Sequence, residues 1–150
     1  MKKILSTPDF DFYSPEISDL ELPFVGDIAC GFPSPAEDFV NDSIDLNKLL
    51  IKHPEATFCA RARGSSLYPL VLPGSILVID RSEEWSTDRL AACYVDGEFT
   101  AKWIKKEGNK LSLIPFNSDF PVLEYNDSTE IIIWGIVTAI INQNVRLNRL

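Results

Sequence analysis

The sequence predicts a mainly β fold, a compact β domain preceded by a flexible N-terminal arm. Three observations predict it: short apolar stretches with strand-like alternation recur after residue 57, turn residues separate them, and no stretch between them is long enough for a long helix. At 150 residues the chain suffices for one domain with a sizeable core.

Residues 1–31 are expected to form a flexible acidic arm. Within residues 1–29, two lysines stand against six acidic residues, and three prolines interrupt any helical period. This composition predicts an extended chain.

Residues 32–56 are expected to form a linker with short helices. Ser34 is a candidate cap for a helix that begins at Pro35 and reaches about Asn41. Asp45 can cap a second short helix, with Leu46, Leu49 and Leu50 on one face and Pro54 at its end.

Residues 57–142 are expected to form the β domain, followed by a polar tail over residues 143–150. The predicted strands cover residues 57–62, 75–80, 90–95, 99–105, 110–115, 122–125 and 131–141. The dipeptides Pro73-Gly74, Asp96-Gly97 and Gly108-Asn109 supply turn signals between strands.

Composition excludes several function classes. A net charge of −8 disfavours direct nucleic-acid binding, which depends on neutralising phosphates. Three widely spaced cysteines and one histidine suggest neither a disulfide framework nor a metal site, so no metal or cofactor is expected. The longest apolar stretch, residues 131–141, is too short to cross a bilayer, and no secretory signal is visible. We therefore expect a cytoplasmic protein that does not bind membranes.

Ser66 and Lys102 are the candidate catalytic pair. Ser66 lies in a turn after an apolar strand, where backbone amides could point at one carbonyl oxygen. Strand alternation places Lys102 on one face with Thr100 and Ile104. A lysine of ordinary pKa is neutral in only about 0.04 % of molecules at pH 7, so a lysine base needs an apolar setting that lowers its pKa. Serine with lysine is a known variant of the catalytic triad.

The chain resembles UmuD-like members of the LexA-like family of self-cleaving serine peptidases. The similar segments are Gly64-Ser65-Ser66-Leu67, residues 96–102, residues 30–36, residues 45–54, residues 113–118 and Gly135-Ile136-Val137. They cover roughly residues 22–141 in the family order. Where UmuD-like proteins usually have Gly-Asp-Ser-Met, this chain has Ser65 and Leu67, so Ser65 offers a rival hydroxyl and Ser66 is assigned by register.

The resemblance implies that Ser66 is the nucleophile and Lys102 the general base, and that the backbone amides of Ser65 and Ser66 form the oxyanion hole. It also implies that the bond between Cys30 and Gly31 is the one cleaved. Cleavage in such proteins is stimulated by RecA filaments on single-stranded DNA during the SOS response. The trimmed homodimer then joins a Y-family, UmuC-like polymerase subunit for error-prone translesion synthesis, with the sliding clamp a further candidate partner.

Other function classes remain open. The same fold could be a non-catalytic interaction module that regulates a polymerase or replication partner, with Leu22-Pro23-Phe24 as a weak anchor motif. A LexA-type repressor needs a helix-turn-helix, which the acidic, proline-broken first fifty residues do not provide. Signal peptidases share the Ser-Lys chemistry but need a membrane anchor.

Overall fold

The computed structural model describes residues 2–8, 10–15, 22–24, 42–119, 121–125 and 130–143. It confirms the mainly β class. The strands are β1 (Lys2–Ser6), β2 (Phe10–Ser14), β3 (Leu22–Phe24), β4 (Asp42–Ile44), β5 (Thr57–Ala62), β6 (Ile76–Asp80), β7 (Leu90–Val95), β8 (Glu98–Glu107), β9 (Lys110–Ile114), β10 (Leu123–Tyr125) and β11 (Ile131–Ile141). A single turn-length helix, α1 (Leu46–Leu50), accompanies them among the described residues.

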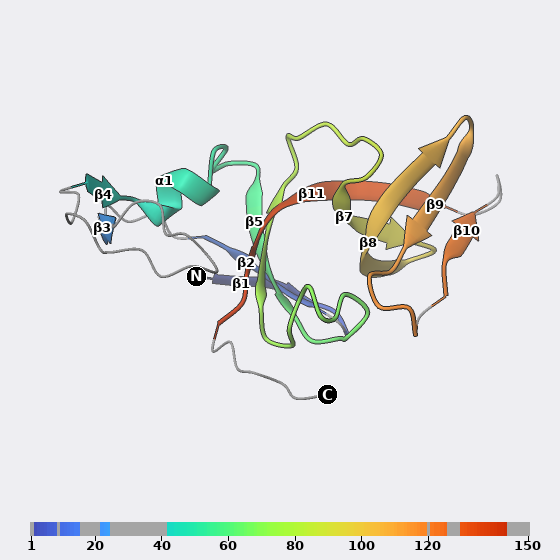
Figure 1. Cartoon of the computed structure of the whole chain (residues 1–150), viewed down its shortest axis with the longest axis horizontal. Coiled ribbons are helices and arrows are strands. Elements are labelled where there is room, and N and C mark those ends of the chain that lie inside the picture. Colours follow the sequence, from blue (N-terminus) through green and yellow to red (C-terminus); the bar gives the residue numbers. More distant parts are fainter. Residues whose placement is uncertain are drawn as a thin grey trace, which may run out of the picture. The chain divides into compact units, whose positions relative to one another are not determined.

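Nine of these strands form one antiparallel sheet. Their order is β1-β2-β5-β6-β11-β7-β8-β9-β10, so the last long strand, β11, lies between β6 and β7 (Figure 1). Asp96 and Gly97, both with positive φ, make the two-residue turn between β7 and β8, as the Asp-Gly signal predicted. The predicted strands of the β domain are therefore confirmed, with ends shifted by two residues at most.

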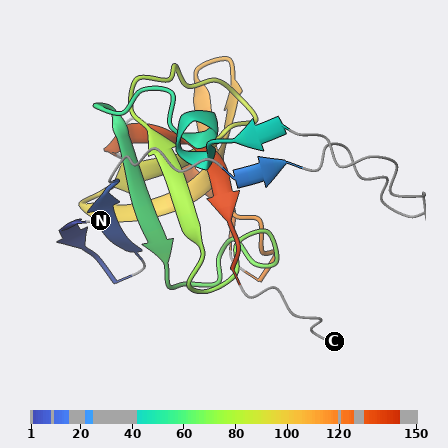
Figure 2. The same ribbon diagram turned by 90° about the vertical axis from the view of Figure 1, so that its left-hand side faces the viewer.

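The N-terminal residues differ from the sequence expectation. In place of an extended arm over this part, residues 2–14 form a hairpin whose second strand, β2, pairs with β5 (Figure 2). Phe10 and Phe12 point into the core and are 7 % and 3 % exposed. The free energy gained by burying these two rings stabilises the hairpin, although the acidic, proline-containing composition predicted an arm.

The sheet has an apolar cluster on each face. One contains Phe12, Leu77 and Ala101, and the other contains Cys93, Ile104 and Leu113. Neighbouring residues along β8 thus enter different clusters, as the period-two alternation of a strand requires.

Residues 17–52 form a separate unit. In it β3 pairs antiparallel with β4, and the Oδ1 of Asp45 accepts a 3.1 Å hydrogen bond from the backbone N–H of Lys48 at the start of α1. The predicted Asp45 cap is confirmed. The predicted helix over residues 34–41 and the Cys30–Gly31 bond lie outside the described residues, in the chain segment that connects β3 to β4.

Candidate active site

Lys102 lies in the middle of β8 and is buried. It is opposite Ala91 of β7, and it is 7 % exposed. Lysine is rarely buried to this degree, because its ammonium group is costly to remove from water. Strand alternation predicted the face on which Lys102 lies, and the burial could be seen only in the structure.

Two buried apolar residues neighbour Lys102 on this face, Ala91 opposite it in β7 and Ile104 two positions along β8. Cys93, a neighbour of Lys102 in the same cross-strand ladder, is fully buried and pairs with Thr100. Burial raises the pKa of the Cys93 thiol to about 12, and the charge of Lys102 opposes that rise. Cys93 therefore remains a protonated thiol beside Lys102 and is a poor nucleophile.

Ser66 lies in the connection between β5 and β6. The carbonyl oxygen of Ser65 accepts a 3.0 Å hydrogen bond from the N–H of Tyr68, which closes a tight turn around Ser66. Leu67 is 4 % exposed in the core and anchors this turn, whereas Ser65 is exposed and Ser66 is half-buried. Leu67, which stands where UmuD-like proteins usually have methionine, thus fills an apolar position.

Asn117 holds the turn from the other side. Its backbone N–H donates to the carbonyl oxygen of Ser66 at 3.0 Å, and its Nδ2 donates to the carbonyl oxygen of Ser65 at 3.1 Å. Its own Oδ1 accepts a 3.0 Å bond from the N–H of Asp119. Two successive peptide groups at the candidate nucleophile are therefore fixed by one residue.

The same bonds orient an amide of the expected oxyanion hole. A trans peptide directs its C=O and N–H in opposite directions. Because the Ser65 carbonyl faces Asn117 and Tyr68, the N–H of Ser66 points away from both. A backbone amide so held can serve as an oxyanion donor.

Asn142 fastens the rest of this connection. Its Oδ1 accepts bonds from the N–H of Leu72 at 3.3 Å and the hydroxyl of Ser75 at 2.5 Å, and its Nδ2 donates to the carbonyl oxygen of Leu70 at 3.1 Å. The loop after Ser66 is thereby tied to the end of β11.

Strand β9 and the loop after it link the Ser66 turn to the strand of Lys102. Asn117 follows β9 by three residues, and Ile114 at the end of β9 pairs with Trp103 of β8. The loop after β9 lies beside the β5–β6 connection in Figure 1, as the bonds from Asn117 require. The structure thus connects the two candidate residues through one strand pair and one hydrogen-bonded loop.

His53, Asp80 and Glu83 form a separate polar group whose ligand atoms lie within 4.8 Å of one another. The Nδ1 of His53 and the Oδ2 of Asp80 are 2.6 Å apart, while Oδ1 of Asp80 accepts two bonds from Ser82. Burial opposes ionisation of Asp80, but the bonds from Ser82 and His53 outweigh it and hold its pKa below its usual value. These contacts with Ser82 and His53 explain how an ionised carboxylate is stabilised at this buried position.

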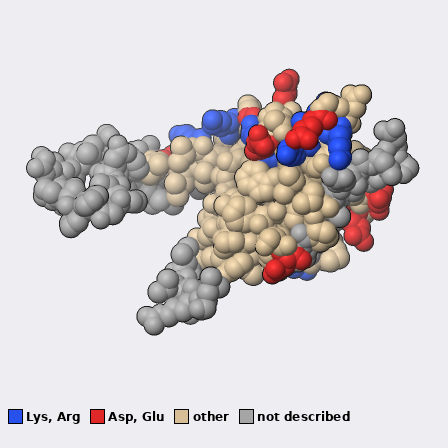
Figure 3. Space-filling view, turned by 45° about the vertical axis from the view of Figure 1, so that its right-hand side comes forward, with Lys and Arg blue, Asp and Glu red and all other residues tan. Residues whose placement is uncertain are grey.

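The charged side chains of the described residues do not make a continuous basic surface on the face shown in Figure 3. Lysines and arginines there are interspersed with acidic residues. Among the described residues, Arg89 pairs with Glu83 at 4.0 Å and Lys105 with Glu107 at 3.0 Å. A mixed surface of this kind offers phosphates no extended binding track.

The described residues thus form an antiparallel β domain that carries a hydrogen-bonded serine turn and a buried lysine. The profile of the family described as Peptidase S24-like matches residues 23–138. The chain belongs to this family of serine peptidases.

Three curated relatives illustrate the similarity. The chain is 38 % identical to Protein SamA of Salmonella typhimurium over 114 residues, which cover 75 % of this chain and 79 % of SamA. It is 35 % identical to Protein MucA of Escherichia coli, over 74 % of this chain and 77 % of MucA. It is 30 % identical to the LexA repressor of Ectopseudomonas mendocina, over 83 % of this chain and 62 % of LexA. The resemblance to UmuD-like and LexA-like peptidases is therefore confirmed.

The contacts of Asn117 with the Ser66 turn do not follow from the sequence. Its segment, residues 113–118, resembles the family, but no spacing rule relates it to Ser66. An asparagine in a turn beyond a strand was the available signal, since such side chains commonly hydrogen-bond to backbone groups.

None of the helices in the part of the chain that the structure describes is long and apolar enough to span a bilayer.

Proposed function

We propose that this peptidase cleaves its own chain between Cys30 and Gly31, with Ser66 as nucleophile and Lys102 as general base. The burial of Lys102 carries the proposal, because removal from water favours the neutral amine that a base must be. The braced turn at Ser66 supports it further, since a nucleophile must be held in position.

In the proposed reaction the Oγ of Ser66 attacks the carbonyl carbon of Cys30, and Nζ of Lys102 takes the hydroxyl proton. The N–H groups of Ser65 and Ser66 stabilise the developing oxyanion. Lys102 then gives its proton to the departing amine of Gly31. Water hydrolyses the resulting ester, which frees Ser66 and leaves a carboxylate on Cys30.

Ser66 is favoured over the other candidate nucleophiles. Ser65 is exposed, and its carbonyl is tied back by Asn117. Cys59 and Cys93 are both buried, and burial raises the pKa of both thiols. Neither cysteine supplies a thiolate at neutral pH.

Intact mass measured over time, at neutral and at mildly alkaline pH, tests this assignment. We expect fragments that end at Cys30 and begin at Gly31, formed faster at the higher pH because more Lys102 is neutral there. Ser66→Ala and Lys102→Ala are each expected to abolish scission, whereas Ser65→Ala and the exposed neighbour variant Lys105→Ala retain it. Persistent cleavage in either of the first two variants contradicts the proposed dyad.

The proposed biological setting is the SOS response to DNA damage. Resemblance to UmuD-like proteins supports scission that is stimulated by RecA filaments on single-stranded DNA. The processed chain would form a homodimer that binds a Y-family, UmuC-like polymerase subunit, with the sliding clamp as a further partner. Adding activated RecA to the intact-mass assay tests the stimulation. No scission under any of these conditions would favour the non-catalytic interaction module.

A further inference from the structure

The β1–β2 hairpin lies outside the matched family region, which begins at residue 23. It is nevertheless part of the same compact unit as the β domain, which includes residues 1–16 together with residues 53–150. Strands β1 and β2 therefore lie outside the matched region, at the edge of the sheet of this chain.

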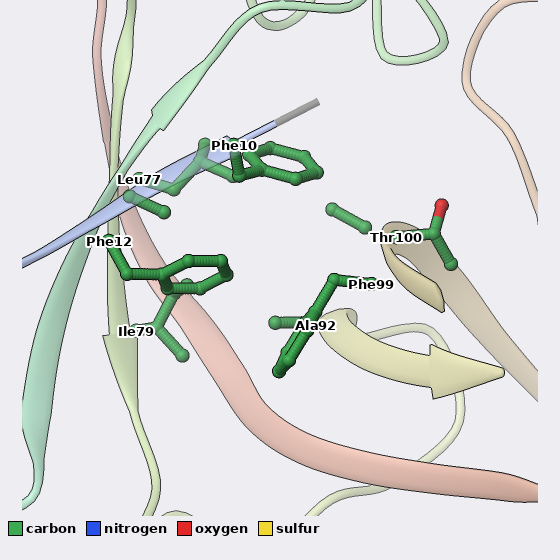
Figure 4. Close-up of a pocket in the computed structure, with 9 residues that line it drawn as sticks. Phe10, Phe12, Leu77, Ile79, Ala92, Phe99 and Thr100 are labelled. Atoms are coloured by element: carbon green, nitrogen blue, oxygen red, sulfur yellow. The ribbon is translucent and has the colours of Figure 1, made fainter. Parts of the chain in front are cut away.

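The hairpin inserts two aromatic side chains into the domain. Figure 4 shows Phe10 and Phe12 of β2 pointing into a pocket whose opposite wall includes Ala92 and Phe99. The ring of Phe12 is centred 5.0 Å from that of Phe99 and 5.4 Å from that of Trp134. The alternate positions of β2 therefore line this apolar space together with residues of β5, β6, β7 and β8.

The residue between the two phenylalanines is fixed by polar contacts. Asp11 is 7 % exposed, forms ion pairs with Arg63 and with Lys3 (2.9 Å), and accepts a 2.5 Å hydrogen bond from Ser6. The hydrogen bond from Arg63 is the largest cause that holds the pKa of Asp11 well below its ordinary value. Because Arg63 is three residues before Ser66, the hairpin is bonded to the segment that leads into the candidate nucleophile.

We infer that the edge of β5, with the apolar wall beside it, is a strand-binding site whose occupant is residues 2–14 of this chain, and that this segment stays bound after scission. The inference rests on the proposed function. Scission adds one water across the Cys30–Gly31 bond, leaving a carboxylate on Cys30 and an amine on Gly31. It changes none of the contacts that β2 makes.

The position of the proposed cut supports retention. After the cut, residues 1–30 would carry β1, β2 and β3. The larger product would carry β5, with which β2 pairs, and β4, with which β3 pairs. Two strand pairs thus continue to join the products. Loss of the hairpin would instead expose the pairing edge of β5 and the pocket, an aggregation-prone combination.

The test uses the full chain with Ser66→Ala and a recognition sequence for a site-specific protease inserted between Cys30 and Gly31. After complete cutting by the added protease, size-exclusion chromatography at micromolar concentration is expected to give one peak. Denaturing mass analysis of that peak should find both fragments in equal amounts. Separate elution of the two fragments would overturn the inference.

This design separates the inference from the proposed function. A wild-type chain that does not cleave itself with or without activated RecA refutes self-cleavage, while the inserted site still reports whether the hairpin stays. A wild-type chain that cleaves itself and then loses residues 1–30 refutes only the retention.

Matched variants identify the contacts responsible. Phe12→Ala is expected to weaken retention by about a hundredfold or more, the usual consequence of deleting a buried phenylalanine ring. Ile4→Ala removes an apolar side chain of the same hairpin that is 54 % exposed, and is expected to leave retention unchanged. Equal retention in the two variants would contradict the assigned site.

Hydrogen exchange on the chain with only the protease site and Ser66→Ala covers the case in which Phe12→Ala fails to fold. Backbone amides of residues 10–13 are expected to keep their protection after the cut. Exchange at the rate of an unstructured peptide would overturn the inference.

Discussion

The backbone N–H of Asn117 donates a 3.0 Å hydrogen bond to the carbonyl oxygen of Ser66. The two residues are fifty-one positions apart in the sequence and belong to different loops. With the second bond, from Nδ2 of Asn117 to the Ser65 carbonyl, this contact makes Asn117 a positioning residue for the proposed nucleophile.

Asn117→Ala is expected to slow self-cleavage roughly five- to tenfold. It removes the bond from Nδ2 to the Ser65 carbonyl and the bond that Oδ1 accepts from Asp119; each neutral hydrogen bond is worth about 1 kcal/mol, and the first holds the Ser65–Ser66 peptide. Single-turnover scission rates measured across pH would check this. The rate should fall without a shift in its pH dependence, since Lys102 remains in place. Asn109→Ala, in the turn at the other end of β9, is the control and should not change the rate. A shifted pH profile in Asn117→Ala would contradict a role confined to positioning Ser66.

The Asp11 contacts should make stability depend on pH in acid. The pKa of Asp11 is lowered from its ordinary value of 3.8 in the folded state, mainly by Arg63. The stability that ionised Asp11 contributes to the folded state is therefore fully present above pH 4. It is lost as the pH falls below the ordinary pKa of Asp11 toward the lowered pKa of the folded state. We expect Asp11→Asn to lower the melting temperature at pH 6, with a smaller difference from the wild type at pH 2.5.

Melting curves between pH 2.5 and pH 6 measure this effect. Asp119→Asn, at an exposed position, is the control and should match the wild type throughout. A difference between Asp11→Asn and the wild type that stays constant over this pH range would contradict the proposed linkage.

Gly135 permits close packing between β11 and β6. A Cβ at this position would lie 2.7 Å from Cγ2 of Ile79 and 3.2 Å from the carbonyl oxygen of Asp80. Gly135→Ala is therefore expected to destabilise the domain by about 1–3 kcal/mol, the usual cost of overpacking a core. Urea unfolding measures the change, with Thr138→Ala, at a more exposed position of the same strand, as the comparison. Equal stabilities of the Gly135→Ala variant and the wild type would contradict this packing.

Cys93 should resist thiol reagents in the folded protein. Its pKa is raised from 9.0 to about 12, so three units of difference reduce the thiolate fraction about a thousandfold. In a chain with Cys30→Ser and Cys59→Ser, labelling by a maleimide is expected to be at least that much slower than in urea. Mass spectrometry over time measures the rate, and rapid labelling of the native chain would refute the burial of this thiol.

Local sequence determined the β segments after residue 57 and their turns. The apolar stretches, the Asp-Gly turn and the Asp45 cap act over a few residues, so periodicity and capping rules located them. The face of β8 on which Lys102 lies also followed from alternation alone.

Tertiary structure decided what depends on contacts between distant residues. The composition of residues 1–31 predicted an arm, but the partner of Phe10 and Phe12 is an apolar wall built from strands that begin almost fifty residues later. Likewise, neither the burial of Lys102 nor the bonds from Asn117 to the Ser66 turn can be read from spacing, because they exist only once β8, β9 and their loops are paired. The sequence by itself determined the strands and turns after residue 57 and the two candidate residues. The pairing of strands decided the environment of those residues and the place of the hairpin, since burial and pairing energies are properties of the assembled sheet.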